Sequence, residues 1–377
     1  MSPHTAAPGE RTEHVLEEAL TAPLPTRLSA LPALPKGTSL ADGAAAVAAV
    51  VVPVAAVAED GAGPGADGQA SKGPPQPRRG AAEAAVSFRT DVAAWAEVSS
   101  MSGKAGEILT VAAPGRGTLP QRLVLLGVGD ESAASLRAAG AALARATAGL
   151  DVVRASVVDG LAEPLQRAFV EGFLLGGYRP PRAGLSGGPK PMASVLELTG
   201  ASAEVLRRAA GTARAVWLAR NLANMPSNVK NPAWMAAQAG RLAAESGLRN
   251  RVRDEQDLAR GGFGGILAVG EGSASAPRLV ELSYTPAAPS EGARHIVLVG
   301  KGITFDTGGV SLKPREALVP MKTDMAGAGV VLAVLSAAAG LGVGHRVTGL
   351  LPLAENAIGA GSYRPGDVVT VYGGTTV

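Results

Sequence analysis

The chain has 377 residues, of which 46% are hydrophobic and 18% charged, a composition typical of globular proteins rather than disordered ones. Its formal net charge of +3 is small for this length, and the basic residues are scattered, which gives weak support for nucleic-acid binding. The absence of cysteine excludes disulfides and thiolate chemistry, and four histidines argue against a histidine-rich zinc site.

The N-terminal region shows no targeting signal. Residues 1–18 contain four glutamates and lack a basic segment followed by an apolar one, so a secretory signal is not expected. The longest apolar run, Gly43–Ala58, is interrupted by Pro53 and is short for a membrane span of about 20 residues. Its valine-rich part, Ala48–Val57, is predicted to be a buried strand, and a membrane segment is the less favoured alternative.

The first half of the chain alternates short Val/Leu/Ala runs with helical stretches, which is typical of βαβ units and a mostly parallel sheet. Further strands are expected at Gly106–Ala112, Arg122–Gly127 and Val152–Val158. A helix is expected after Ser132, a suitable N-cap residue, and a second over Pro164–Leu175, before two glycines.

Two segments rich in glycine and proline, Gly61–Gly80 and Arg179–Pro191, are predicted to be loops. The second marks a domain boundary, with an N-terminal α/β domain over 1–190, a linker and connecting helix over 191–221, and a C-terminal domain over 222–377. The elements expected in the C-terminal domain are a helix at Pro232–Ser246, strands at Gly265–Val269 and His295–Val299, a helix at Ala326–Ala339, and strands at Arg346–Leu351 and Val371–Val377.

The segment 300–327 concentrates the residues best suited to catalysis or metal binding. Three of the chain's 8 lysines lie in it, although arginines outnumber lysines 27 to 8 overall. A buried lysine can give up its proton near neutral pH and an arginine cannot, so the pattern favours chemistry that needs amines. The candidate residues, spaced among glycines, are Lys301, Asp306, Lys313 and Asp324.

The position of these residues supports a ligand site, without excluding a structural role. The apolar run His295–Val299 precedes Lys301, and ligands of open α/β sheets bind just beyond the carboxyl ends of strands. Two carboxylates with lysine amines suit Mg²⁺ or Mn²⁺, and carboxylates also suit Zn²⁺. On these residues alone an alternative stays open, in which Lys301 and Asp306 form a surface ion pair and Asp324 caps the following helix.

Several separated motifs resemble the leucine (cytosol) aminopeptidase family. The strongest are VGKGITFDTGGVSLKP at Val299–Pro314 and MKTDMAG at Met321–Gly327, supported in the family's order by Asn221–Pro226, Glu355–Asn356 and Tyr363–Asp367. Over the first half the resemblance is looser, and it depends mainly on Leu123–Gly129 and Glu171–Tyr178.

The resemblance implies an N-terminal macro-like α/β domain and a C-terminal α/β metallo-exopeptidase domain, in a cytoplasmic homohexamer. It implies removal of leucine-type, apolar residues from peptides with a free N-terminus, by a two-metal, metal-bound hydroxide mechanism with Mn²⁺ or Zn²⁺. Carried over by residue, Lys301 and Asp324 bind one metal, Asp306 bridges both metals, Lys313 is a catalytic electrophile, and Met321 lines the pocket for the first side chain.

The chain departs from the family pattern at one point, because no segment resembles the downstream family motif Asn-Thr-Asp-Ala-Glu-Gly-Arg. Without the acidic residues of that motif a pair of metals lacks two of its anionic ligands, so we expect the chain as printed to be a fragment with little or no peptidase activity. Glu355 and Asp367 are poor substitutes, since both lie in motifs of structural character.

Two hypotheses from other classes remain. The chain could be a non-catalytic member of the same family that acts by oligomerisation or DNA binding, since some family members bind DNA. A nucleotide-binding or phosphate-binding enzyme is disfavoured, because no Lys-Ser or Lys-Thr follows the glycines of Gly261–Gly265. No membrane partner is expected.

Overall fold

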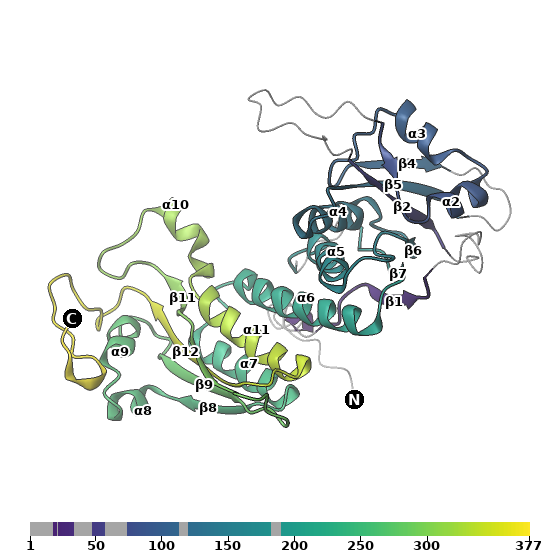
Figure 1. Ribbon diagram of the computed structural model, residues 1–377. Helices are drawn as coiled ribbons and strands as arrows, with labels where there is room; N and C mark the ends of the chain where they lie inside the picture. The colour runs from purple at the N-terminus through teal and green to yellow at the C-terminus, as the bar shows by residue number, and fades with distance from the viewer. Residues whose placement is uncertain (1–17, 21, 34–46, 57–73, 113–119, 182–189) are drawn as a thin grey trace, which may run out of the picture. The chain divides into compact units, whose positions relative to one another are not determined.

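The computed structural model describes residues 18–20, 22–33, 47–56, 74–112, 120–181 and 190–377 (Figure 1). Most of the two predicted loops and nearly all of the acidic N-terminal segment lie outside these residues. The chain divides into two compact units, an N-terminal unit that includes Pro23–Arg179 and a C-terminal unit that includes Arg214–Val377. Both units are α/β, as the sequence predicts.

The N-terminal unit contains a seven-stranded sheet. Its strands are β1 (Arg27–Leu31), β2 (Ala49–Ala55), β3 (Gln76–Pro77), β4 (Ile108–Ala112), β5 (Arg122–Gly129), β6 (Val152–Ala155) and β7 (Val195–Thr199). The order is β1-β7-β6-β2-β5-β4, with β3 beside β2, and the pairs are parallel except β4 with β5 and β3 with β2. The four strands predicted in this half are therefore present as β2, β4, β5 and β6.

The helices of this unit are α2 (Ala81–Phe88), α3 (Val92–Val98), α4 (Ala133–Ala146) and α5 (Glu163–Gly176). As predicted, Ser132 caps α4, because its hydroxyl accepts a hydrogen bond from the backbone amide of Ser135 at 3.2 Å. Helices α4 and α5 pack through glycines: a Cβ on Gly140 would lie 2.2 Å from the Phe169 carbonyl oxygen. The absence of side chains at this crossing lets the two backbones approach closely.

The apolar run that raised the membrane alternative is β2, a central strand whose seven residues are all buried. One other stretch of the described residues, Arg315–Leu341, is helical, long and apolar enough by composition to cross a membrane. Its apolar part contributes Val331, Leu332 and Leu335 to the core of the C-terminal unit, which accounts for its hydropathy without a membrane.

The C-terminal unit contains a five-stranded mixed sheet. Its strands are β8 (Arg249–Arg253), β9 (Arg278–Tyr284), β10 (His295–Val299), β11 (Gly302–Asp306) and β12 (Arg346–Asn356). The long strand β12 lies parallel to both β10 and β11 and antiparallel to β9, and β9 pairs with β8. Strands β10 and β11 follow one another along the same side of β12.

The helices of this part of the chain are α6 (Ala203–Asn224), α7 (Pro232–Glu245), α8 (Glu255–Arg260), α9 (Gly264–Gly270), α10 (Arg315–Leu318), α11 (Ala326–Leu341) and the 3-10 helices η1 (Val319–Thr323) and η2 (Tyr372–Gly374). The division between the two units falls within α6. The end of α6, together with α7 and α11, packs against β9 and β12 around a core that includes Leu222, Met235, Leu282, Met325 and Leu332.

Two predicted strands are wrong. Residues 265–269 form most of α9, because a short apolar run has no periodicity that separates a strand from one or two turns of helix. Residues 371–377 instead contain η2 within a tight reversal, in which Thr370 bridges Thr376 and the amides of Val369 and Val377 bond to each other's carbonyls. The two glycines of η2 have positive φ angles, which favour this reversal.

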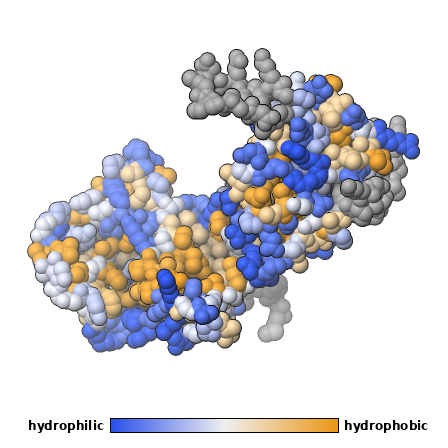
Figure 2. Space-filling view, viewed as in Figure 1, coloured by the Kyte–Doolittle hydropathy of each residue, from blue (hydrophilic) through white to orange (hydrophobic). Residues whose placement is uncertain are grey.

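Apolar side chains also reach the surface of the C-terminal unit (Figure 2). Strand β10 pairs only with β12 among the described strands, and it exposes Val297 and Val299, while α11 exposes Val330 and Val334. The sheet edge that carries β10 is therefore the more apolar one, whereas the opposite edge strand, β8, carries three arginines.

Candidate metal centre

Asp306 is held by three hydrogen bonds at the carboxyl end of β11. Its Oδ1 accepts from the Gly308 amide and from Nδ2 of Asn356, each at 2.8 Å, and its Oδ2 accepts from Nζ of Lys313 at 2.5 Å. Asn356 lies opposite Asp306 in the register of β11 with β12, and its carbonyl accepts from both the amide and the hydroxyl of Thr307 at 2.8 Å. Both side chains are thus fixed where two neighbouring strands end.

The chain after Asp306 reverses at two glycines. Gly308 and Gly309 have φ angles of +88° and +60°, which residues with a side chain rarely adopt. A Cβ on Gly308 would lie 2.3 Å from the Ser311 carbonyl oxygen. This turn brings Lys313 back beside Thr307, whose carbonyl accepts the Lys313 amide at 2.9 Å, and so directs the lysine amine to Asp306.

The second lysine–aspartate pair joins the start of β11 to the end of η1. Nζ of Lys301 lies 3.0 Å from Oδ1 of Asp324, and the Lys301 side chain is 62% exposed whereas that of Asp324 is 21% exposed. The surface ion pair considered from the sequence, Lys301 with Asp306, is therefore wrong: each lysine pairs with a different aspartate.

The helix-cap alternative for Asp324 is also wrong. Helix α11 begins at Ala326 with Met325 in the N-cap position and no side-chain cap. Oδ2 of Asp324 is buried and has no hydrogen-bond partner among the described residues. A buried, unpaired carboxylate oxygen is costly in an apoprotein, and it is also the atom that a cation would satisfy.

Met321 connects the two pairs. Its Sδ lies 3.2 Å from Nζ of Lys313, and its carbonyl accepts the Asp324 amide at 3.2 Å. The five residues predicted to form the site therefore lie along one continuous series of contacts: Asp306, Lys313, Met321, Asp324 and Lys301.

Close backbone contact fixes the distance between the segments that carry this series. A Cβ on Gly300 would lie 2.4 Å from the Gly327 carbonyl oxygen, so the turn after β10 touches the first turn of α11 directly. The Ala328 amide also donates to the Lys301 carbonyl at 2.8 Å. Because of these contacts, Lys301 is presented to Asp324 from a fixed backbone.

The charge of Asp306 suits a bound cation, but the number of acidic ligands near it is small. The pKa of Asp306 lies below its ordinary value of 3.8: burial acts to raise it, but the hydrogen bonds from Lys313, Gly308 and Asn356 outweigh that effect. These hydrogen bonds favour the anionic form of Asp306, and Oδ2 of Asp324 has no hydrogen-bond partner among the described residues. However, no group of three or more His, Cys, Asp or Glu residues that could hold a metal occurs within the described residues.

The two acidic residues weighed as substitutes have other partners. Arg364 donates to Asp367 from its amide at 2.8 Å and from Nη2 at 3.2 Å, and these bonds lower the pKa of Asp367. Burial raises the pKa of Glu355, opposed by a hydrogen bond involving Ser275. Asp367 therefore serves to close a turn, and Glu355 is directed toward Ser275.

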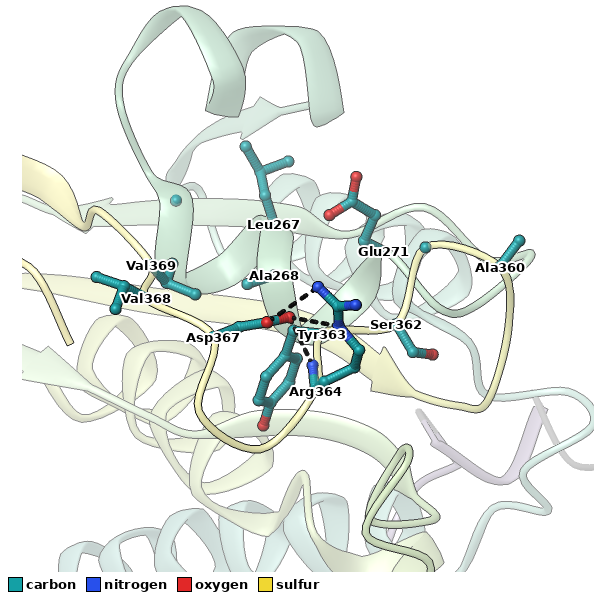
Figure 3. Close-up of a pocket in the computed structure, with 12 residues that line it drawn as sticks. Leu267, Ala268, Glu271, Ala360, Ser362, Tyr363, Arg364, Asp367, Val368 and Val369 are labelled. Carbon is teal, nitrogen blue, oxygen red and sulfur yellow. Dashed lines mark hydrogen bonds and ion pairs between the residues drawn. The ribbon is translucent and has the colours of Figure 1, made fainter.

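A pocket of about 650 Å³ lies elsewhere in the C-terminal unit, between α9 and the segment 360–369 (Figure 3). Arg364 and Asp367 face each other at its wall, with Glu271 of the helix end nearby. None of the five predicted site residues lines it, so the pocket is separate from the lysine–aspartate series.

Two residues near the site are not identified by sequence reasoning as contributors to it. Asn356 belongs to a motif of the family resemblance, and only the strand register shows that it holds Asp306. Lys230 carries no sequence signal, yet it is fully buried and bonds to the Lys322 carbonyl at 2.6 Å. Burial, and after it the charge of Lys322, lowers the pKa of Lys230 from 10.5 to about 7.

The fold and the site together define an α/β protein of two units, whose C-terminal unit presents paired lysines and carboxylates where a parallel strand ends. Residues 217–377 match the model of the cytosol aminopeptidase family, catalytic domain, and residues 78–182 match that of the same family's N-terminal domain. The chain belongs to the cytosol aminopeptidase family, and the predicted two-domain α/β fold is confirmed.

Curated relatives agree with this assignment. A probable cytosol aminopeptidase of Micrococcus luteus is 43% identical over 281 residues, which are 70% of this chain and 54% of that protein. One from Streptomyces avermitilis is 40% identical over 308 residues, 76% of this chain and 59% of that protein. The chain thus spans little more than half the length of the relatives it matches.

Solved structures show the same fold. The bottromycin maturation enzyme BotP in complex with Mn is 32% identical, with a TM-score of 0.69 over 88% of this chain and 64% of that one. A tomato leucine aminopeptidase mutant is 22% identical, with a TM-score of 0.72 over 95% of this chain and 68% of that one, and it supports the fold alone.

Proposed function

We propose that this chain forms part of a metal-dependent aminopeptidase that removes leucine-type, apolar residues from peptides with a free N-terminus. The observation that carries the proposal is the unpaired, buried Oδ2 of Asp324, beside Lys301 and linked through Met321 to Lys313 and Asp306. Oxygen atoms and a deprotonated amine are a ligand set that suits divalent cations.

In this proposal Lys301, Asp306 and Asp324 would be the residues of this chain that hold the divalent cations. Oδ2 of Asp324 is available as a metal ligand, since no hydrogen-bond donor among the described residues occupies it. Lys301 can contribute its amine only after losing its proton, which a neighbouring dication promotes. Both Mn²⁺ and Zn²⁺ fit these donors, and the manganese complex of BotP favours Mn²⁺.

Two bound dications supply Lewis-acid activation of water and of the peptide carbonyl. The residues of this chain contribute orientation and charge. Lys313, held 2.5 Å from Oδ2 of Asp306, offers its amine as a hydrogen-bond donor to the oxyanion that develops during peptide hydrolysis. Met321 contacts that same amine through its sulfur at 3.2 Å, and in this proposal it lines the pocket for the first side chain of the substrate.

The activity of the 377 residues by themselves is a separate part of the proposal. Two carboxylates and one amine give fewer anionic ligands than a pair of dications needs, and the described residues offer no further cluster. We therefore propose that these residues bind metal weakly and hydrolyse peptides slowly or not at all. The homohexameric state and cytoplasmic location of the whole protein also belong to the proposal.

Hydrolysis of leucinamide with Mn²⁺ or Zn²⁺ tests both parts, with the Micrococcus relative as the positive control. We expect little turnover by the 377-residue chain, and robust turnover would contradict the incomplete ligand set. Mn²⁺ binding, followed by the electron paramagnetic resonance signal of the free ion, tests the site itself. Binding that is lost in Asp306→Asn and Asp324→Asn supports the proposed ligands, whereas binding equal to that of the parent chain rejects them.

A further inference from the structure

The buried side chain of Lys230 is unusual because it has no acidic partner among the described residues. Lys230 lies in the turn between α6 and α7, directly before Asn231, the N-cap residue of α7. No part of it is exposed. Burying a lysine without a carboxylate is costly unless its nitrogen has other hydrogen-bond acceptors, so the position of those acceptors indicates what the residue does.

The Lys230 nitrogen has four acceptors, on two separate segments. It donates to the carbonyls of Leu222 at 2.8 Å and Ala223 at 3.2 Å, which belong to the last turn of α6. Carbonyls at a helix end lack partners within the helix, and a lysine there also interacts favourably with the helix dipole. Half of the lysine's contacts therefore close the end of α6.

The other two acceptors flank Asp324. The Lys322 carbonyl lies 2.6 Å from Nζ of Lys230, and Sδ of Met325 lies 3.2 Å from it. A second lysine links the same two segments: Nζ of Lys322 donates to the carbonyl of Asn224, the last residue of α6, at 3.3 Å. Two lysines thus connect the end of α6 to the four-residue stretch 322–325, which contains the aspartate.

The contacts of Asp324 itself are weaker restraints. Its only described ion pair is with Lys301, a side chain that is mostly exposed and free to adopt other rotamers, and Oδ2 has no hydrogen-bond partner in the described structure. The direction of the carboxylate is therefore set by the backbone on both sides of it, and Lys230 anchors that backbone to α6.

We propose that Lys230 is a positioning residue, which fixes the backbone at residues 322–325 and thereby orients the Asp324 carboxylate. The consequence for metal binding depends on the proposed function, but the effect on the backbone does not. Groups that orient a ligand without touching the metal commonly change metal affinity by about 10-fold to 100-fold when they are replaced. Lys230 acts in the same way, through carbonyls instead of through the ligand side chain.

Two substitutions of Lys230 in the full chain test this role. Lys230→Met keeps a flexible apolar stem but removes the donors, and Lys230→Gln keeps two donors on a side chain of the same reach as methionine. Lys104→Met, at an exposed lysine in the N-terminal unit, is the matched control. Two quantities are measured for each: amide hydrogen exchange of peptides that cover residues 321–326, and the dissociation constant for Mn²⁺.

We expect exchange at residues 321–326 to rise about 10-fold in Lys230→Met, with the middle of α11 unchanged, because the local opening free energy falls. The Mn²⁺ dissociation constant should rise about 10-fold or more. Lys230→Gln should give a smaller change of both quantities, which a loss of packing alone would not produce, and Lys104→Met should change neither.

Unchanged exchange at residues 321–326 in folded Lys230→Met overturns the proposal. So does faster exchange with an unaltered Mn²⁺ dissociation constant, because Lys230 would then be structural only. If Lys230→Met does not fold, Lys230→Gln decides on the same two criteria. If the parent chain itself binds no Mn²⁺, the proposed metal function fails, and exchange alone then decides whether Lys230 fixes the backbone around Asp324.

Discussion

The amine of Lys301 lies 3.0 Å from one oxygen of the Asp324 carboxylate, and the other oxygen of that carboxylate is buried without a hydrogen-bond donor among the described residues. One oxygen of Asp324 is therefore paired and the other has no described partner. Its burial costs free energy that a bound cation would recover, and this asymmetry leads to the first prediction.

Asp324→Asn should leave the stability of the metal-free chain unchanged or slightly higher, because it removes a buried charge and supplies a donor. Saturating Mn²⁺ should stabilise the parent chain by about 2.7 kcal/mol at a hundred times its dissociation constant, and should not stabilise the variant. Thermal unfolding with and without Mn²⁺ measures both effects. Asp367→Asn, which alters a carboxylate paired with Arg364, is the control that should keep the response to Mn²⁺.

Asn356→Ala should weaken the site through Asp306. The substitution removes the 2.8 Å hydrogen bond to Oδ1 and leaves Asp306 held by Gly308 and Lys313 only. We expect a loss of about 1 kcal/mol in the free energy of unfolding, and Mn²⁺ affinity at least about 10-fold lower. Urea unfolding and metal titration check the two numbers, and unaltered affinity would show that Asp306 is oriented without Asn356.

Gly140→Ala should destabilise the N-terminal unit, because the added methyl group would meet the backbone of α5 at 2.2 Å. Forcing the two helices apart should cost about 1 to 3 kcal/mol. Gly340→Ala is the matched control: it also lies in a helix, but its Cβ would meet nothing within 4 Å, so a gain of about 0.5 to 1 kcal/mol is expected. Equal effects in denaturant titrations would contradict the close packing of α4 on α5.

The stability of the chain should depend on pH through Lys230. Its pKa is about 7 in the folded protein and 10.5 as the ordinary value, so between these pH values the unfolded chain holds a proton that the folded chain lacks. Unfolding then takes up a proton, and the free energy of unfolding rises with pH by up to about 1.4 kcal/mol per pH unit. Comparing the parent with Lys230→Met from pH 7 to 10.5 isolates this slope, which the variant should lack.

The sequence predicts the parts of the fold that have a strong pattern. The valine run of β2 and the capped, periodic helix α4 occur where expected, because burial and local hydrogen bonding act in the same direction at these positions. The run Gly265–Val269 is misjudged as a strand because four successive apolar residues after a glycine fit either structure. The helix packs against β12, and this tertiary contact cannot be read from the local sequence.

The candidate site is predictable in its residue types but not in its pairing. Lys301 and Asp306 are neighbours in sequence, yet β11 extends between them and carries Asp306 toward Lys313. Asp324 lies at the end of η1, and this position brings its carboxylate next to the amine of Lys301. Lys230 could not be found in this way, because its partners are backbone carbonyls, and any residue type could supply those.

The contact between Gly300 and Gly327 sets a limit on sequence change near the site. Since a single methyl group at Gly300 would lie 2.4 Å from the Gly327 carbonyl, the loop before Lys301 and the helix after Asp324 cannot be separated by a side chain without moving both. Neither glycine has a side chain that could bind a metal or a substrate. In a screen of random variants for metal binding, these two positions should nevertheless be as intolerant as the lysine and the aspartate that they hold together.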